Sequence, residues 1–496
     1  MRVGAAHHET TGTEGTTRGD ETPVMSFAQR RIWFMDRLAG GSSDALLPLA
    51  VRLEGDLDIP ALERSLRGIL ERHEILRTRY PGTDGDPTPH VEDAGRVVLE
   101  HTTAVDVDEF FARELGRPID PAGEPPVRMV LARTAPREHV LLVIVHHIAV
   151  DGWSWNILLR ELAAGYRGEP VSPPRRRYAD FARDERRRLT GPRMERLLDY
   201  WRGRLAGLTP LELPTDRPRP AFWDGEGDVV RFALSTEVVA DVDRVAREHR
   251  ATRYMVLLAV YQALLAHRSG RTDIAVCSTM TDRGRPGAEE VVGPFVNTLV
   301  LRNDLSGGPG FGALLERVRG NVLQDLSRAE APFDRVVGEV VTGRDMSRHP
   351  LAQASFTLLN AGYEPLRLPG LRAELLPAPL AGSPLDVFLD LGLLPDGRIA
   401  ARLQYATALF DRATMEDFAA SYTRLLRAVL ADRTTPVAEL ARRSAPTGAT
   451  DPAVTAAAPA PVVRHRTPVR LWGGGGSAVV CGDRVVSYGE LEGLSG

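Results

Sequence analysis

One run of the sequence restricts the fold more than any other. Six apolar residues, VLLVIV (140–145), lead directly into His146 and His147, and Asp151 and Gly152 follow shortly after. A short apolar run of this kind is typical of a buried strand in a sheet that helices cover. We therefore expect an α/β fold in which a buried strand ends on two imidazole rings.

The order of the two histidines predicts different roles for them. Adjacent side chains of a strand point to opposite faces, so His146 and His147 cannot both face one cleft. We expect one ring to pack in the core and the other to meet substrate. The spacing also argues against a metal, because two ligands of one ion prefer HxH on a strand or HxxxH on a helix.

The loop after the histidines carries an acid and a glycine. Gly152 permits a close backbone approach or a positive φ. The next residues, WSWNILLREL (153–162), predict a helix whose first amides are unpaired and can stabilise an oxyanion beside a neutral, basic imidazole. On the residues alone, Asp151 either orients His147 as in a triad, pairs with an arginine to brace the loop, or simply caps the helix.

Composition restricts the class of protein. A chain of 496 residues is too long for one ordinary core and fits two or three domains. Its 62 Lys and Arg nearly balance 66 Asp and Glu, so no basic excess exists to bind nucleic acid. Two cysteines, Cys277 and Cys481, exclude a disulfide framework and fit a reducing cytoplasm. No run approaches the roughly 18 apolar residues of a membrane helix, and we expect no secretory signal in the N-terminal stretch because it lacks an apolar h-region.

Two strand-helix series predict two mixed α/β lobes of similar size, with the boundary near PLELPTDRPRPAF (210–222). The expected strands are 47–55, 97–101, 127–133, 140–145, 229–235, 273–280, 293–304 and 399–410, and the expected helices are 26–38, 59–80, 152–166, 252–270, 311–328 and 413–432. The expected domains are a flexible tail (1–22), two lobes (23–210 and 211–441), an Ala/Pro/Thr-rich linker (442–470) and the truncated, hairpin-like start of a further domain (471–496).

The segment HHIAVDGWS resembles the HHxxxDG signature of the condensation domains of nonribosomal peptide synthetases. Its HxxxD core is shared with the chloramphenicol acetyltransferase-like acyltransferases. SFAQRRIWFMDRL resembles the family's first motif, RHEILRTRY its second, YADFA its fourth, VGPFVNTLVLR its fifth and GRDMSRHPL its last, and LQYATALFDRATMEDF matches the usual close of the fold. These motifs follow the family's order from about Met25 to Leu440. The fragment after Ser477 resembles the first strands of an adenylation domain.

The resemblance implies a V-shaped pair of chloramphenicol acetyltransferase-like lobes with a tunnel at their interface. Upstream donor and downstream acceptor peptidyl carrier proteins dock at opposite mouths and insert phosphopantetheine arms, so the domain itself binds no cofactor. The acceptor's α-amine attacks the donor thioester to form a peptide bond. This makes the chain an acyltransferase of antibiotic or secondary-metabolite biosynthesis, next to an adenylation domain.

The resemblance also assigns roles to single residues. His147 accepts a proton from the amine or positions it, and His146 is the structural ring. Asp151 braces the loop through a salt bridge to Arg72 or Arg77 of RHEILRT. The remaining candidates are Gly152, which leaves room for the arm and can donate its amide, and the tunnel-lining residues Trp153, Ser154, Asn297 and Arg344, with Trp33 and Trp153 weighed mainly as packing residues.

Two departures from the family's motifs matter. Ala331 stands where the family usually has an aromatic residue, and RDER follows YADFA where Trp-Gln is usual, which puts partner contacts in doubt more than chemistry.

Several alternative functions stay open. The same site could form an ester, acylate with a fatty chain as a starter domain, or take a D-configured donor, whereas an epimerisation domain would not normally precede an adenylation domain. A non-catalytic recruitment domain would be expected to lack His147 or Gly152. Because Met1 lies just ahead of the first motif, we expect the donor to arrive in trans.

Overall fold

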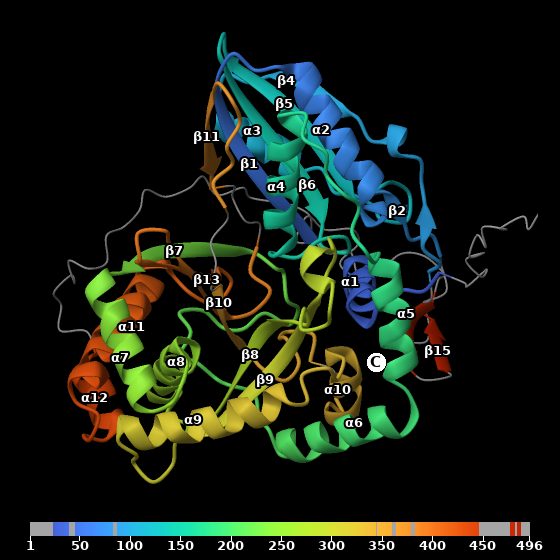
Figure 1. Cartoon of the computed structure of the whole chain (residues 1–496). Coiled ribbons are helices and arrows are strands. Elements are labelled where there is room, and N and C mark those ends of the chain that lie inside the picture. Colours follow the sequence, from blue (N-terminus) through green and yellow to red (C-terminus); the bar gives the residue numbers. More distant parts are fainter. Residues whose placement is uncertain are drawn as a thin grey trace, which may run out of the picture.

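Each lobe of the protein is built on one sheet with helices packed against it (Figure 1). A computed structural model describes residues 23–38, 45–82, 87–343, 345–359, 364–377, 382–445, 477–481 and 484–487. The first lobe and its connection contain α1 (Phe27–Leu38), β1 (Leu46–Gly55), α2 (Ile59–Arg72), η2 (Glu74–Arg77), β2 (Thr78–Arg79), β3 (His90–Val91), η3 (Ala94–Arg96), β4 (Leu99–Thr103), α3 (Val107–Leu115), β5 (Val127–Ala135), β6 (Glu138–His146), α4 (Ser154–Tyr166), α5 (Tyr178–Arg188) and α6 (Gly191–Leu205).

The sheet of the first lobe has the order β11-β1-β6-β5-β4, so β6 lies at its centre. Alternate residues of the VLLVIV run enter two separate cores. Leu141 and Val145 pack with α2 and α4, whereas Leu142 and Ile144 pack with the phenylalanines of α3. The run is apolar throughout because both of its faces are covered.

The second lobe has a six-stranded mixed sheet of order β7-β13-β12-β10-β8-β9. Its buried helix α8 is capped at Thr252, whose hydroxyl accepts from the Met255 amide at 3.3 Å, and ends at Gly270 with φ 69°. Only a residue tolerant of left-handed backbone suits that C-cap. This part of the chain contains β7 (Gly227–Leu234), α7 (Thr236–Glu248), α8 (Arg253–Ser269), β8 (Asp273–Thr281), η4 (Ala288–Glu290), β9 (Val296–Asp304), α9 (Phe311–Leu326), α10 (Phe333–Val340), β10 (Ala354–Leu359), β11 (Leu371–Leu376), β12 (Val387–Leu393), β13 (Ile399–Ala406), α11 (Arg412–Ala431) and α12 (Val437–Arg443), and all but β11 belong to the second lobe.

Two segments lie across the boundary that we expected near residue 210. Strand β11 comes late in the chain, yet it pairs antiparallel with β1 at the edge of the first lobe's sheet (Figure 1). Leu366 and Leu368, just before it, belong to the first lobe's core. Conversely, Leu197 and Trp201 of α6 are buried in the core of the second lobe. The lobes are therefore interleaved rather than simply consecutive.

Helix α1 lies between the two lobes and contacts both (Figure 1). The Gln29 Nε2 atom donates to the carbonyl of Ile148 at 3.3 Å, in the loop after β6. The Arg31 Nη1 atom donates to the Thr298 hydroxyl at 2.8 Å, on β9 of the second lobe. This helix therefore carries charged and polar side chains to the place where the lobes meet.

Most predicted elements form at the expected positions. The helix expected over 59–80 ends early, at Arg72, because His73 leaves the helical region with φ −110° and ψ 86°. The hairpin-like pattern near the C-terminus is confirmed, since β14 (Ser477–Cys481) pairs antiparallel with β15 (Arg484–Ser487). The tail (1–22) lies outside the described residues, as does the linker apart from its first residues. Within the described ranges, no helix is long and apolar enough to cross a membrane.

Candidate active site

His146, the last residue of β6, is sealed inside the first lobe. Its Nδ1 atom accepts a hydrogen bond from the Ile148 amide at 3.1 Å, so the ring proton lies on Nε2. That Nε2 atom faces the Asp36 carboxylate of α1 at 3.5 Å, and both side chains are buried. His146 thus ties the end of the strand to α1 and offers no atom to a substrate.

His147 is held differently and remains half-buried. Its Nδ1 atom lies 2.7 Å from the carbonyl oxygen of Val150, which can only accept, so Nδ1 carries the proton. No described residue forms a hydrogen bond with its Nε2 atom. This atom is accessible, whereas Nε2 of His146 is fully buried and has no hydrogen-bond partner among the described residues. Burial lowers the pKa of His147, so the ring stays neutral with an accessible lone pair.

Asp151 braces the loop instead of orienting the histidine. Its carboxylate is buried, and it accepts from the amide and the hydroxyl of Ser154 at 2.9 and 2.7 Å. The second oxygen accepts from the amide of Phe295, in the other lobe, at 3.2 Å. Because Nδ1 of His147 donates to Val150, the hydrogen bond of a triad is absent between these two described residues.

The arginine that pairs with Asp151 is Arg283, which follows β8 of the second lobe. Its Nη2 atom lies 2.8 Å from Asp151 Oδ1. Its Nη1 atom donates to the carbonyls of Ala288 and Val291 at 2.6 and 2.8 Å, and its Cζ atom lies 4.4 Å from the ring centroid of Phe295. One guanidinium thus organises the whole loop between β8 and β9 and fastens it to the histidine loop.

The expected pairing of Asp151 with Arg72 or Arg77 is wrong. Arg72 forms a salt bridge with Glu161 of α4 at 2.9 Å. Arg77 donates to the carbonyl of Leu70 at 3.0 Å and to that of Glu92. Both guanidinium groups are used by nearer acceptors of their own lobe, so neither supports the histidine loop directly.

The three residues after Asp151 differ in exposure. Gly152 is exposed, its φ is not positive, and a Cβ atom added there would meet nothing within 4 Å. Trp153 is 46% exposed, and its Nε1 atom donates to the Glu289 carbonyl at 3.1 Å, so it packs on the second lobe's loop rather than in a core. Trp33, by contrast, is buried in the first core. Ser154 is fully buried between Asp151 and the second lobe. Contrary to our expectation, it therefore does not line a passage.

Asn297 has a structural role. Its Nδ2 atom donates to the carbonyls of Ala329 and Ala331 at 2.8 and 2.6 Å, and its Oδ1 atom accepts from the Phe333 amide at 3.2 Å. The carboxamide thereby holds the turn between α9 and α10 against β9. Arg344, the other candidate from the second lobe, lies outside the described residues.

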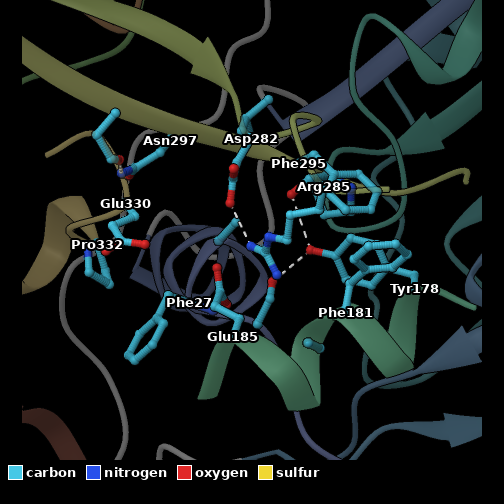
Figure 2. A pocket seen from close by; sticks show the side chains of 16 residues that line it. Phe27, Tyr178, Phe181, Glu185, Asp282, Arg285, Phe295, Asn297, Glu330 and Pro332 are labelled. Atoms are coloured by element: carbon cyan, nitrogen blue, oxygen red, sulfur yellow. Dashed lines mark hydrogen bonds and ion pairs between the residues drawn. The ribbon is translucent and has the colours of Figure 1, made fainter. Parts of the chain in front are cut away.

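A pocket lies between α1, α5 and the loop after β8 (Figure 2). Its cavity volume is about 40 Å³, which is room for a few water molecules but not for a thioester arm. Glu185 accepts from the Phe27 amide at 2.8 Å, and burial raises the pKa of its carboxyl. Tyr178 donates to the Pro294 carbonyl at 3.1 Å. These contacts fasten α5 to both lobes, and the expected tunnel stays a prediction.

Sequence reasoning missed three charged residues of this interface: Arg31, Asp36 and Arg283. Two of them interrupt the apolar pattern of the first motif, SFAQRRIWFMDRL, and that irregularity was the available signal. Arg283 follows the predicted strand DIAVCSTM, where a polar side chain at a strand end could have marked it. Among the described residues, no group of three or more His, Cys, Asp or Glu side chains could hold a metal ion.

Comparison with known proteins finds one family. A family model described as "Condensation domain" matches residues 20–445. The chain is 40% identical over 428 residues to a probable non-canonical nonribosomal peptide synthetase, CymA, of Salinispora arenicola, covering 83% of this chain and 6% of that protein. It is 36% identical over 436 residues to malpinin synthetase of Mortierella alpina, covering 85% of this chain and 6% of that protein.

The same comparison reaches solved structures. The X-domain in its complex with OxyB from teicoplanin biosynthesis matches with a TM-score of 0.77 and 30% identity, covering 88% of this chain and 99% of that one. Together with the sheets described above, this match confirms the predicted α/β fold of two lobes. The chain spans only about 6% of the length of the first curated relatives that it matches.

Proposed function

Because the chain belongs to the condensation-domain family of nonribosomal peptide synthetases, we propose that it joins two carrier-bound substrates through a peptide bond. The donor is an acyl or peptidyl thioester, and the acceptor is the α-amine of an aminoacyl thioester. Both reactants hang on phosphopantetheine arms of partner carrier proteins. The observation that carries the proposal is the neutral, half-buried His147, whose Nε2 lone pair is free where the lobes meet.

The chemistry follows from that lone pair. The acceptor nitrogen attacks the thioester carbon, the carbon–sulfur bond breaks, and the proton of the amine ends on the departing thiolate. Nε2 of His147 accepts a hydrogen bond from the amine and so either positions it or removes its proton. An amine near its own pKa is partly neutral already, so positioning alone could supply much of the rate.

The backbone beside His147 supports the same step. The amides of Gly152 and Trp153 donate to no acceptor within the described residues, and both residues are exposed at the start of α4. We assign them to the developing oxyanion of the thioester carbonyl, a role that unpaired amides at a helix start suit. Asp151 and Arg283 position this loop and do not touch substrate.

The experiment loads two carrier proteins with aminoacyl thioesters and follows dipeptidyl thioester by intact mass. The wild-type protein is expected to form the dipeptide, and His147→Ala is expected to form little or none. Replacing the acceptor by a hydroxyacyl thioester, or the donor by a fatty acyl thioester, tests ester formation and starter acylation in the same assay. Wild type without any product would overturn the proposal.

A second candidate function is recruitment of a partner enzyme without catalysis. Its specific support is the match to the teicoplanin X-domain, whose structure was solved in complex with OxyB. The presence of both His147 and Gly152 supports the catalytic proposal instead. If the wild-type protein binds a carrier protein but forms no product from any thioester pair, the recruitment function replaces the catalytic one.

A further inference from the structure

The second lobe holds an imidazole in the same manner as the first. The Nδ1 atom of His349 lies 3.2 Å from the carbonyl oxygen of Ala352, three residues ahead, as Nδ1 of His147 faces Val150, also three residues ahead. Because a carbonyl only accepts, Nδ1 of His349 carries the ring proton. Each ring is thus held by its own loop and keeps the lone pair of Nε2 for another partner.

His349 is connected to the interlobe helix through one aromatic ring. It stacks on Phe333 with ring centroids 5.7 Å apart and an interplanar angle of 23°. The Cζ atom of Arg31, from α1, lies 5.6 Å from the centroid of the same Phe333 ring. The same helix contacts the loop of His147 through Gln29. His349, Phe333 and Arg31 therefore form one contiguous group on the second-lobe side of the interface.

The charge of Arg31 acts on both imidazoles. Burial and, to a smaller extent, this guanidinium hold the pKa of His349 at about 4, and they also lower the pKa of His147. His349 is therefore neutral at physiological pH. The residue is half-buried. Its Nε2 atom forms no hydrogen bond with a described residue, and this atom is not fully buried. Nε2 of His349 is accordingly an accessible acceptor.

We propose that His349 is a specificity-determining residue whose Nε2 atom accepts a hydrogen bond from a hydroxyl or N–H group of a substrate side chain. This inference rests on the proposed function of the domain. A hydroxyl or N–H group suits the place because either can donate to the neutral imidazole. The shared chemistry is a polar hydrogen on either the donor or the acceptor amino acid, and the two are separated by experiment.

The experiment measures kcat/KM for dipeptide formation with pairs of near-isosteric amino acids: threonine against valine, serine against alanine, and tyrosine against phenylalanine. One series varies the acceptor with a glycyl donor, and the other varies the donor with a glycyl acceptor. In one of the two series, wild type is expected to prefer a hydroxyl-bearing member by about tenfold or more, since a site that hydrogen-bonds a hydroxyl rejects the analogue that lacks it.

His349→Ala is expected to reduce this preference to about threefold or less, because the acceptor is gone. His349→Gln, whose side-chain oxygen can replace the Nε2 lone pair, is expected to retain most of it. His267→Ala, which removes a half-buried histidine near the end of α8, serves as the matched control and should leave the preference unchanged. Should His349→Ala fail to fold, His349→Asn replaces it, because asparagine keeps a donor for the Ala352 carbonyl and removes the outer acceptor.

The outcomes separate this inference from the function on which it rests. If both members of every pair give product, two results overturn the role of His349: equal rates in wild type, or a preference that His349→Ala leaves unchanged. Either result leaves the proposed function standing. A dipeptide preference lost equally in the Ala and Gln variants shows a packing role and also overturns it. No product from any pair overturns both.

Discussion

Asp151 of the first lobe and Arg283 of the second lie 2.8 Å apart, with side chains only 1% and 6% exposed. Their ion pair is the centre of a network that also uses the Ser154 hydroxyl and the backbone of Gly293. A buried pair of this kind is costly to break, because the remaining charge has no water to solvate it. The geometry of the histidine loop therefore depends on a residue 132 positions away in the chain.

The first prediction concerns this pair. Asp151→Asn should lower the free energy of unfolding by about 3–5 kcal/mol, because it leaves the Arg283 guanidinium buried without a counter-charge. Arg283→Met should have a similar effect, and the double variant should lose less than the sum of the two. Urea unfolding of the four proteins measures this coupling. An Asp151→Asn protein that is stable and soluble but inactive would instead indicate a relay role.

The two histidines are expected to respond in opposite ways. His147→Ala should reduce dipeptide formation by about 10²-fold or more while the melting temperature stays within a few degrees, because its outer nitrogen holds nothing in the fold. His146→Ala should mainly destabilise the protein, since it removes a fully buried ring and leaves the Asp36 carboxylate unpaired. Thermal unfolding together with the intact-mass assay measures both effects. Unfolding of the His147 variant would show that the rings are assigned to the wrong roles.

The acid limb of the pH profile offers a test of His147 without substitution. Burial lowers the pKa of this ring, so Nε2 keeps its lone pair until the pH falls below the usual histidine range of ~6.5. The acceptor α-amine is itself protonated below about pH 7.7–8.0, so kcat/KM should decline once in that range. We expect a second decline only below the usual histidine range, as protonation of His147 removes the acceptor. Circular dichroism at each pH controls for unfolding. A second decline centred at or above the usual histidine pKa would contradict the assignment.

One glycine of the network should tolerate no side chain. A Cβ atom added at Gly293 would overlap the ring of Tyr178, whose hydroxyl bonds Ser26 at 2.7 Å. Gly293→Ala should therefore cost about 1–3 kcal/mol of stability and loosen the contact between the lobes. Gly320→Ala, on the exposed face of α9, meets nothing within 4 Å and should be neutral or stabilise by up to about 1 kcal/mol. Equal effects of the two substitutions would show that Tyr178 moves away at little cost.

Local patterns predicted much of this protein. The unbroken apolar run of β6 indicated a strand covered on both sides, and it packs into two cores. The contrast between a sealed His146 and an accessible His147 was expected from the alternation of strand side chains, although the strand itself ends at His146. Such features depend on neighbours in the sequence, and periodicity reports them.

Long-range pairing could not be predicted in the same way. Any arginine could in principle face Asp151, and nothing local distinguishes Arg283 from Arg72, which Glu161 holds. The role of α1 was not predicted either, because its charged residues contact partners in two different lobes. The tertiary arrangement determines which charged residues pair, and a pattern of hydrophobic residues does not specify that arrangement.

The path of β11 affects how such proteins can be recombined. A chimera that exchanged only residues 23–210 would place a foreign β1 beside the host's own β11, where six residue pairs must match across the seam. A first lobe produced alone would leave that edge of β1 bare, and bare edges invite pairing with other molecules. Grafts of the first lobe should therefore include the segment from Leu366 to Leu376 of the same parent, so that the strand travels with the sheet it completes.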